Sequence, residues 1–170
     1  MKSKRESRKP VKPRSKHLLQ QLARTPEKLF AKAFRNQYGA ICFRRKDGDC
    51  EVEILVITSR DTGRWIVPKG WPMKGKEPHE AAAMEAWEEA GVRGKARKTS
   101  IGCYTYLKEL EGGEVVPCVV EMFQVEVKEV EAQFKERGQR VLDWVSPDEA
   151  ARRVREVELK SLLANFKPQG

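Results

Sequence analysis

The sequence predicts an α/β fold of the mixed α+β type, built as a single domain. Short apolar segments bounded by glycine, proline and charged turn residues recur along residues 38–145, as strands do. Helix-like segments stand between and after them, and three of these carry proline at the first helical position. The 170 residues, of which 39% are hydrophobic, are sufficient for one core but not for two comfortable domains.

The first part of the chain is expected to hold a tail, a helical extension and a strand-rich region. Residues 1–16 contain two prolines and no apolar periodicity, which is typical of disorder. Residues 17–34 form the extension, with Thr25 as the N-cap of a short helix. Three strands follow, the first two of them as a hairpin: residues 38–43, 51–58 and 64–67.

The second part of the chain is expected to contain one helix, then several strands, then two more helices. Gly91 suits the left-handed position after a helix, Gly112–Gly113 suits a hairpin turn, and Ser146 suits an N-cap. The expected elements are a helix over residues 78–90, strands over 101–108, 114–126 and 141–145, a helix that begins at Ser146, and a helix over 157–166.

Positive charge is concentrated at the N-terminus. Residues 1–16 hold eight of the 34 Lys and Arg and one of the 25 Asp and Glu, so they carry +7 of the formal net charge of +9. Such a tail is either a solvated segment or a weak binding site for an anionic partner. The rest of the chain is nearly balanced, so the net charge alone does not indicate a nucleic-acid-binding domain.

Cysteine use and hydropathy indicate a cytoplasmic protein. The four cysteines show no C-x-x-C spacing and lie in or beside strand-like segments, which favours neither a zinc site nor a disulfide framework. No apolar run reaches the roughly 18 residues that a membrane helix needs. No secretory signal is evident, although Arg, Lys and Ser at the N-terminus leave a transit peptide open.

Three carboxylates share one face of the predicted helix over residues 78–90. Glu85, Glu88 and Glu89 stand at i, i+3 and i+4, within an arc of about 100°. The opposite face carries Ala83, Ala86, Trp87 and Ala90, and we expect it to be buried, with Trp87 in the core.

The three carboxylates have two interpretations. They form either a solvated acidic face, which is common on helices, or a cation site. No Lys or Arg at helix-neighbour spacing on the C-terminal side neutralises them. Carboxylate oxygens without His or Cys suit Mg²⁺ or Mn²⁺ better than zinc.

The longer stretch from Gly70 to Val92 resembles the Nudix box, whose pattern is G-x5-E-x7-R-E-U-x-E-E-x-G-U with U an aliphatic residue. Gly70 opens this pattern, and Gly91 and Val92 close it. Glu85, Glu88 and Glu89 occupy its three clustered glutamate positions. A match of this length between a predicted strand and the end of a predicted helix is a strong signal.

Two positions depart from the box. Lys76 stands where the family has its first glutamate, with Glu77 one residue later, and Met84 stands where the family has an arginine. Since that arginine is thought to orient a neighbouring carboxylate, Met84 bears on metal affinity and rate. Glu77 is a candidate substitute for the displaced acid, and Met84 is a candidate for packing on the helix flank.

The resemblance implies a Nudix fold over residues 35–166, with a mixed β-sheet sandwiched between α-helices. It further implies divalent-cation-dependent hydrolysis of a diphosphate linkage by water attack on phosphorus. Glu85 and Glu89 would be the principal metal ligands with the Gly70 carbonyl nearby, and Glu88 a ligand or the general base. Glu121 is a further candidate base or ligand, unless it is a surface residue on an edge strand.

Basic residues before and within the box are candidates for binding substrate phosphates. Residues 59–71 resemble the diphosphoinositol polyphosphate phosphohydrolase branch of the family, which also cleaves dinucleoside polyphosphates. Gln139–Arg140 resembles a basic position of that branch, and Trp71 either stacks on a substrate ring or shields the core. The basic candidates are Arg60, Arg64, Lys69, Lys74, Lys76 and Arg140, of which Arg60 and Lys69 are preferred.

Three functions therefore remain in competition. The first is a Mg²⁺- or Mn²⁺-dependent pyrophosphohydrolase acting on a phosphorylated small molecule. The second is a non-catalytic Nudix-fold protein that binds such a ligand, which Lys76 and Met84 favour. The third is binding of nucleic acid or another anionic partner by residues 1–16, which is compatible with the first.

Overall fold

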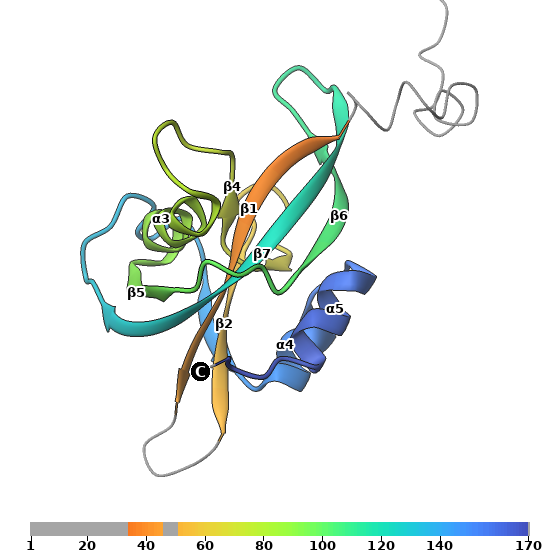
Figure 1. Ribbon diagram of the computed structural model, residues 1–170. Helices are drawn as coiled ribbons and strands as arrows, with labels where there is room; N and C mark the ends of the chain where they lie inside the picture. Colours follow the sequence, from red (N-terminus) through yellow and green to blue (C-terminus); the bar gives the residue numbers. More distant parts are fainter. Residues whose placement is uncertain (1–33, 46–50, 170) are drawn as a thin grey trace, which may run out of the picture. The chain divides into compact units, whose positions relative to one another are not determined.

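A computed structural model describes residues 34–45 and 51–169, which belong to one compact unit (Phe34–Gly170). Its strands stand in two groups along the chain, with one helix between the groups and two helices after them, as Figure 1 shows. The elements are β1 (Arg35–Arg45), β2 (Val52–Thr58), β3 (Trp65–Ile66), β4 (Lys69–Gly70), α3 (Pro78–Ala90), β5 (Val92–Ala96), β6 (Gly102–Glu109), β7 (Val115–Val130), β8 (Leu142–Val145), α4 (Pro147–Arg153) and α5 (Val157–Ala164).

The strands form one mixed sheet with β1 and β7 at its centre. β7 pairs parallel with β1 on one side and antiparallel with β6 and β5 on the other. β1 pairs antiparallel with β2 and, nearer its start, with β4, through the register Tyr38↔Gly70. The short strand β4 therefore lies against a central strand, which fixes the position of Gly70.

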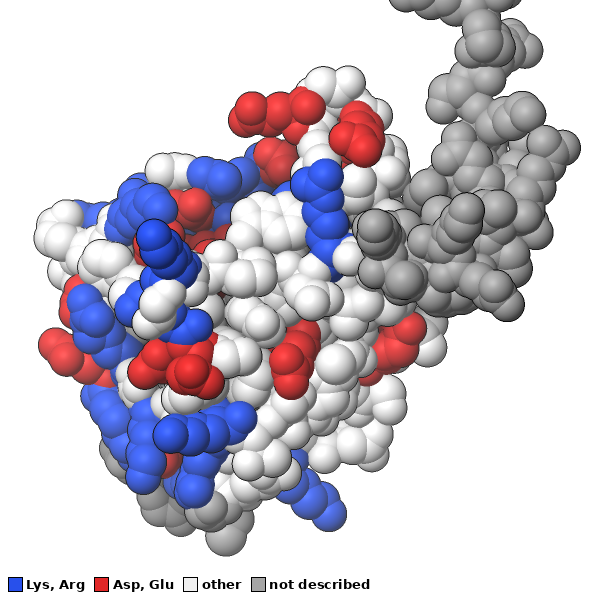
Figure 2. All heavy atoms as spheres, turned by 45° about the horizontal axis from the view of Figure 1, so that its top comes forward, with Lys and Arg blue, Asp and Glu red and all other residues white. Residues whose placement is uncertain are grey.

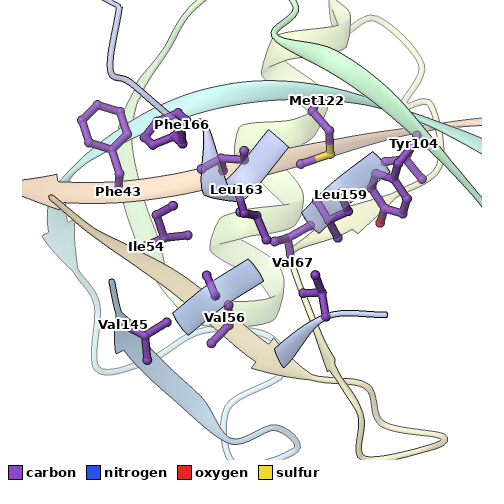
Figure 3. Packing of buried hydrophobic residues seen from close by; sticks show 14 residues of the cluster. Phe43, Ile54, Val56, Val67, Tyr104, Met122, Val145, Leu159, Leu163 and Phe166 are labelled. Atoms are coloured by element: carbon purple, nitrogen blue, oxygen red, sulfur yellow. The ribbon is translucent and has the colours of Figure 1, made fainter. Parts of the chain in front are cut away.

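Helices cover both faces of the sheet, so the expected sandwich is confirmed. On one face α5 contributes Leu159 and Leu163, and α4 contributes Ala150, to a core cluster that includes Ile54 and Met122 of the sheet. Figure 3 shows the two leucines among these sheet residues. On the other face α3 packs its alanines against Phe123 and other sheet residues. Because alanine side chains are small, α3 lies close to the centre of the sheet.

Most of the elements expected from the sequence are present. The β1–β2 hairpin and the β6–β7 hairpin through Gly112–Gly113 are confirmed, as is the cap of α4, where Ser146 accepts a hydrogen bond from the backbone of Glu149 at 3.3 Å. Two short strands, β4 and β5, were not expected. β5 has only five residues, including Gly94, and their apolar pattern is weak. Its strand conformation is therefore stabilised by pairing with β7 and not by local strand propensity.

One expectation, on Glu121, is wrong, and several others concern residues that the structure does not describe. The edge-strand position of Glu121 is wrong, because β7 has neighbours on both sides and Glu121 pairs with Tyr38 and Cys103. Among the described residues, Cys42, Cys103 and Cys118 are free. The tail, the helix near Thr25 and Cys50 lie outside the described residues. None of the described helices is long and apolar enough to cross a membrane.

We expect the packing of α5 to contribute strongly to stability. Leu159→Ala removes a fully buried side chain and should lower the free energy of unfolding by about 2–5 kcal/mol. Val157→Ala on the same helix is a matched control, since Val157 is 75% exposed and its loss should change stability by less than about 0.5 kcal/mol. Urea denaturation of both variants measures the difference, and equal losses would contradict this packing.

Candidate active site

The limits of α3 are set by the residues that flank it. Its N-cap is Glu77, whose backbone N–H donates to the carboxylate of Glu80 at 2.9 Å, and Pro78 follows at the first position. Gly91 ends the helix in the left-handed conformation with a φ of 69°, and its N–H donates to the Trp87 carbonyl at 2.8 Å. Glu77 is thus part of the helix start and does not line the cleft described below.

The buried side of α3 differs from the helical wheel. Ala86 and Ala90 are buried as expected, but Glu89 is buried with them, at 6% exposure. Trp87 is only half-buried, so its expected place in the core is wrong. Its indole N–H donates to Glu131 at 2.6 Å, and the Arg93 guanidinium lies 4.7 Å from its ring centroid. An indole N–H needs such a partner, which the alanine-lined contact with the sheet does not offer.

A polar cleft of about 250 Å³ lies beside α3 and β4. Acidic and basic side chains alternate around it, and Figure 2 shows Lys and Arg intermingled with Asp and Glu on the side of the molecule that carries α3. Its charged lining residues are Arg60, Asp61, Lys69, Glu85, Glu88, Glu89, Lys108, Lys135, Glu136 and Arg140, and its other lining residues include Gly70 and Trp71. The three box carboxylates therefore share one cleft with three of the six basic residues expected to bind phosphate, Arg60, Lys69 and Arg140.

Glu85 lies directly against Gly70. A Cβ atom at position 70 would overlap the Glu85 carboxyl group, so only glycine leaves room for it. Desolvation, followed by repulsion from Glu89 and Glu88, raises the pKa of Glu85 to about 7. Within the described part of the chain, Glu85 has neither a hydrogen bond nor an ion pair. It is therefore a carboxylate whose charge the protein itself leaves largely uncompensated.

The other two box carboxylates have cationic partners from one irregular segment, residues 131–141. Lys135 Nζ lies 2.6 Å from Glu88, in an exposed pair. Arg140 Nη2 lies 2.5 Å from Glu89, in a buried pair. Glu89 also accepts the backbone N–H of Lys69 at 3.1 Å. Desolvation raises the pKa of Glu89, while Lys69 and Arg140 oppose that shift.

The expected substrate-binding residues occupy different places. Arg60, Lys69, Gly70 and Arg140 line the cleft. Arg64 does not, and its guanidinium lies 3.0 Å from Glu156 at the start of α5.

The two departures from the box pattern lie on another side of α3. Lys76 and Met84 line a separate cavity of about 450 Å³, which also borders Trp87 and Arg93. Met84 is therefore placed on the helix flank rather than among the box carboxylates. Met84 does not line the cleft.

Four charged residues of the cleft were not anticipated from the sequence: Asp61 in the loop between β2 and β3, Lys108 on β6, and Lys135 and Glu136 in the segment after β7. The only sequence signal for the latter two is indirect. Since α3 carries no Lys or Arg, its carboxylates require cations from another element.

The donor chemistry of the cleft suits a hard divalent cation. In the described residues no three His, Cys, Asp or Glu side chains converge in the geometry of a preformed metal site. The donors themselves are carboxylate oxygens beside a glycine backbone, which Mg²⁺ and Mn²⁺ prefer. Glu85, without a cationic partner of its own, is the group that such an ion would satisfy.

Comparison with known proteins agrees with this arrangement. A family model described as NUDIX domain matches residues 34–166, more than half of the chain. Nudix hydrolase 16, mitochondrial, of Arabidopsis thaliana is 33% identical over 136 residues, 74% of this chain and 75% of that protein. Diphosphoinositol polyphosphate phosphohydrolase 2 of Rattus norvegicus is 47% identical over 62 residues, only 36% of this chain and 34% of that protein.

Solved structures share the fold at low sequence identity. The crystal structure of C. elegans Ap4A hydrolase has a TM-score of 0.54 and 19% identity, and covers 77% of this chain and 94% of its own. The NUDIX domain of Shewanella oneidensis NrtR, complexed with ADP ribose, has a TM-score of 0.57 and 13% identity, and covers 88% and 96%. The fold that the sequence resemblance implied is thereby confirmed.

We expect Gly70→Ala to disrupt the cleft. The added methyl group would displace the Glu85 carboxylate or the short strand β4, with a loss of about 1–3 kcal/mol in the free energy of unfolding. Gly63→Ala serves as a control for the chemistry, because nothing lies within 4 Å of a Cβ there, although its φ of 66° adds backbone strain. Gly63→Ala should keep its Mn²⁺ affinity in calorimetry while Gly70→Ala loses it; equal affinities would contradict the close contact.

We also expect Glu85 to lower stability at neutral pH when metal is absent. Because its pKa is raised in the folded state, from 4.5 to about 7, folding favours its protonated form. The free energy of unfolding should therefore fall as pH rises through this window. Glu85→Gln should remove that fall and be more stable than wild type by about 1 kcal/mol near pH 8, after allowance for solvent screening.

Urea denaturation in the presence of EDTA measures this effect. The free energy of unfolding of wild type is subtracted from that of Glu85→Gln, once at about pH 4.5 and once at about pH 8. This difference cancels the contributions of groups that titrate alike in both proteins. A stability difference that does not change with pH would show that Glu85 has an ordinary pKa.

Proposed function

The chain belongs to the Nudix hydrolase family, and we propose that its cleft cleaves a diphosphate linkage with the help of Mg²⁺ or Mn²⁺. The observation that carries the proposal is the placement of Glu85 against Gly70, with no ion pair of its own among the described residues and only the more distant charge of Lys135 acting against the rise in its pKa. An uncompensated carboxylate in a desolvated cleft is unfavourable unless a cation joins it. The neighbouring Glu88 and Glu89 add two more oxygen donors.

Each carboxylate has a distinct role in this proposal. Glu85 and Glu89 are the principal metal ligands, with the Gly70 carbonyl nearby, and Glu88 is a further ligand or the general base. Glu88 suits a proton-accepting role because its partner Lys135 is exposed and free to move away. The bound cation would neutralise phosphate charge and lower the pKa of a coordinated water.

Two lysines are available for substrate phosphates. Lys69 Nζ lies 5.2 Å from the Tyr106 ring centroid, and Lys108 Nζ lies 5.8 Å from that of Trp71. Neither ammonium has a carboxylate within salt-bridge distance among the described residues. Desolvation lowers the pKa of Lys69, against the opposing charge of Glu89, and an anion entering the cleft would favour its charged form.

The proposed substrates are small molecules with several phosphates. The rat relative is named for diphosphoinositol polyphosphates, and one solved neighbour is an Ap4A hydrolase. A cleft lined by both cations and carboxylates fits both classes, since each places an anhydride next to further phosphates. Arg60 is half-exposed at the rim, where it contacts Glu136 at 3.2 Å and is accessible to a phosphate.

We propose a cytoplasmic location, because three cysteines of the described residues, Cys42, Cys103 and Cys118, are free. The Arabidopsis relative is named mitochondrial, so a transit function of the basic N-terminus is the alternative. Cell fractionation with and without residues 1–16 separates the two.

The proposal predicts metal-dependent turnover of at least one phosphoric anhydride. Purified protein with Mg²⁺ or Mn²⁺ should release phosphate or nucleotide from a panel of dinucleoside polyphosphates, diphosphoinositol polyphosphates, nucleoside triphosphates and ADP-ribose, and EDTA should abolish this. Glu88→Gln and Glu89→Gln should each lower kcat by about 10²–10⁴-fold.

Two outcomes contradict the proposal at different levels. Tight ligand binding by calorimetry with no turnover of any substrate would favour a non-catalytic ligand-binding protein. Full activity in both glutamine variants would leave the reaction in place and overturn the residue assignment.

A further inference from the structure

Residues 131–141 form a segment that is fixed along the C-terminal half of α3. The backbone N–H of Glu131 donates to the Gly91 carbonyl at 2.7 Å, and that of Glu136 donates to the Glu88 carbonyl at 3.0 Å. Phe134 lies so close to Gly91 that a Cβ atom there would overlap its ring. The segment is therefore attached to the helix at both ends of its last turn.

Arg140, near the end of this segment, donates to protein oxygens from all three of its nitrogens. Nε contacts Glu136 at 2.7 Å, Nη1 contacts the Thr58 carbonyl at 2.9 Å, and Nη2 contacts Glu89 at 2.5 Å. The side chain is only 5% exposed, and those of Glu89 and Glu136 are 8% and 13% exposed. One guanidinium thus joins α3, the end of β2 and the segment itself.

The two cations of the segment differ in kind. The Lys135 side chain is 62% exposed and makes a single contact with Glu88, so its geometry is held weakly. The planar guanidinium of Arg140 has a fixed orientation and is shielded from solvent. Since α3 has no Lys or Arg of its own, Arg140 is the buried cation that fixes the orientation of a box carboxylate within the described residues.

Arg140 is poorly suited to bind a substrate phosphate. Turning it toward a ligand would leave Glu89 and Glu136 buried without their partner, and breaking a buried pair in this way is strongly unfavourable. Its position also leaves Glu89 able to act as a ligand. Each carboxylate oxygen has two acceptor positions, and the bonds from Arg140 and Lys69 use one on each oxygen.

We infer that Arg140 is a positioning residue that fixes Glu89 for cation binding, in place of an arginine within the box, and does not itself bind substrate. This inference rests on the proposed metal-dependent hydrolysis. It relocates the arginine function that the box pattern assigns to position 84 to a segment that follows β7. Met84 on the helix flank is then no obstacle to activity.

The test compares Arg140→Met and Arg140→Lys with wild type and with Arg152→Ala. Arg152 is 69% exposed and pairs with Glu149 on α4, so its loss removes a positive charge without affecting the cleft. The readouts are kcat and KM on a substrate that the wild type turns over, and Mn²⁺ affinity from the electron paramagnetic resonance signal of free Mn²⁺.

For Arg140→Met we expect kcat to fall about 10–100-fold and Mn²⁺ affinity to fall about 10-fold, as for other groups that orient metal ligands. KM should change by less than about 2-fold, because no substrate contact is lost. Arg140→Lys should lie between Arg140→Met and wild type in both kcat and Mn²⁺ affinity. Arg152→Ala should match wild type.

An increase in KM with unchanged kcat and Mn²⁺ affinity would overturn the inference and identify Arg140 as a phosphate ligand. If Arg140→Met does not fold by circular dichroism, Arg140→Lys decides alone, and wild-type kcat and Mn²⁺ affinity in that variant would equally overturn it. If the wild type has no turnover, the proposed function fails. The Mn²⁺ affinities still decide whether Arg140 positions Glu89.

Discussion

The arrangement of the cleft depends on a buried carboxylate, Glu89, and on how the chain compensates it. Burial of a lone carboxylate is strongly unfavourable. Glu89 is stabilised by hydrogen bonds from the Lys69 backbone N–H and from the Arg140 guanidinium. These two contacts bring strand β4 and the segment 131–141 to the same end of α3. The cleft forms where α3, β4 and the segment 131–141 meet at the side chain of Glu89.

Close packing of α3 makes this convergence possible. Alanines on its inner face let the helix lie near the central strands, and Gly70 lets the Glu85 carboxyl lie against the backbone of β4. A larger residue at either place would move the carboxylates away from the loop that faces them. The same packing excludes Trp87 from the core, and its ring instead borders a separate cavity.

Much of this architecture is readable from the sequence, because it is local. Helix α3 follows from Pro78, the alanines and Gly91, and the clustering of Glu85, Glu88 and Glu89 follows from helix geometry alone. The contacts of the segment 131–141 are different. Arg140 meets Glu89 across 51 residues and Thr58 across 82, and no periodic pattern encodes such pairs. The helical pattern predicted a buried Trp87 and an accessible Glu89, whereas Trp87 is half-buried and Glu89 is buried. A pattern based on hydrophobicity takes no account of the hydrogen bond that an indole N–H needs or of the ion pair that lets a carboxylate be buried.

In the proposed reaction, water attacks phosphorus in this cleft with the help of a divalent cation. ³¹P NMR of the products formed in H₂¹⁸O measures this most directly, with the same sample repeated in EDTA. This reaction should place one ¹⁸O atom in a single phosphate product, formed with Mg²⁺ and not with EDTA. Turnover that continues in EDTA, or products without ¹⁸O bound to phosphorus, would contradict it.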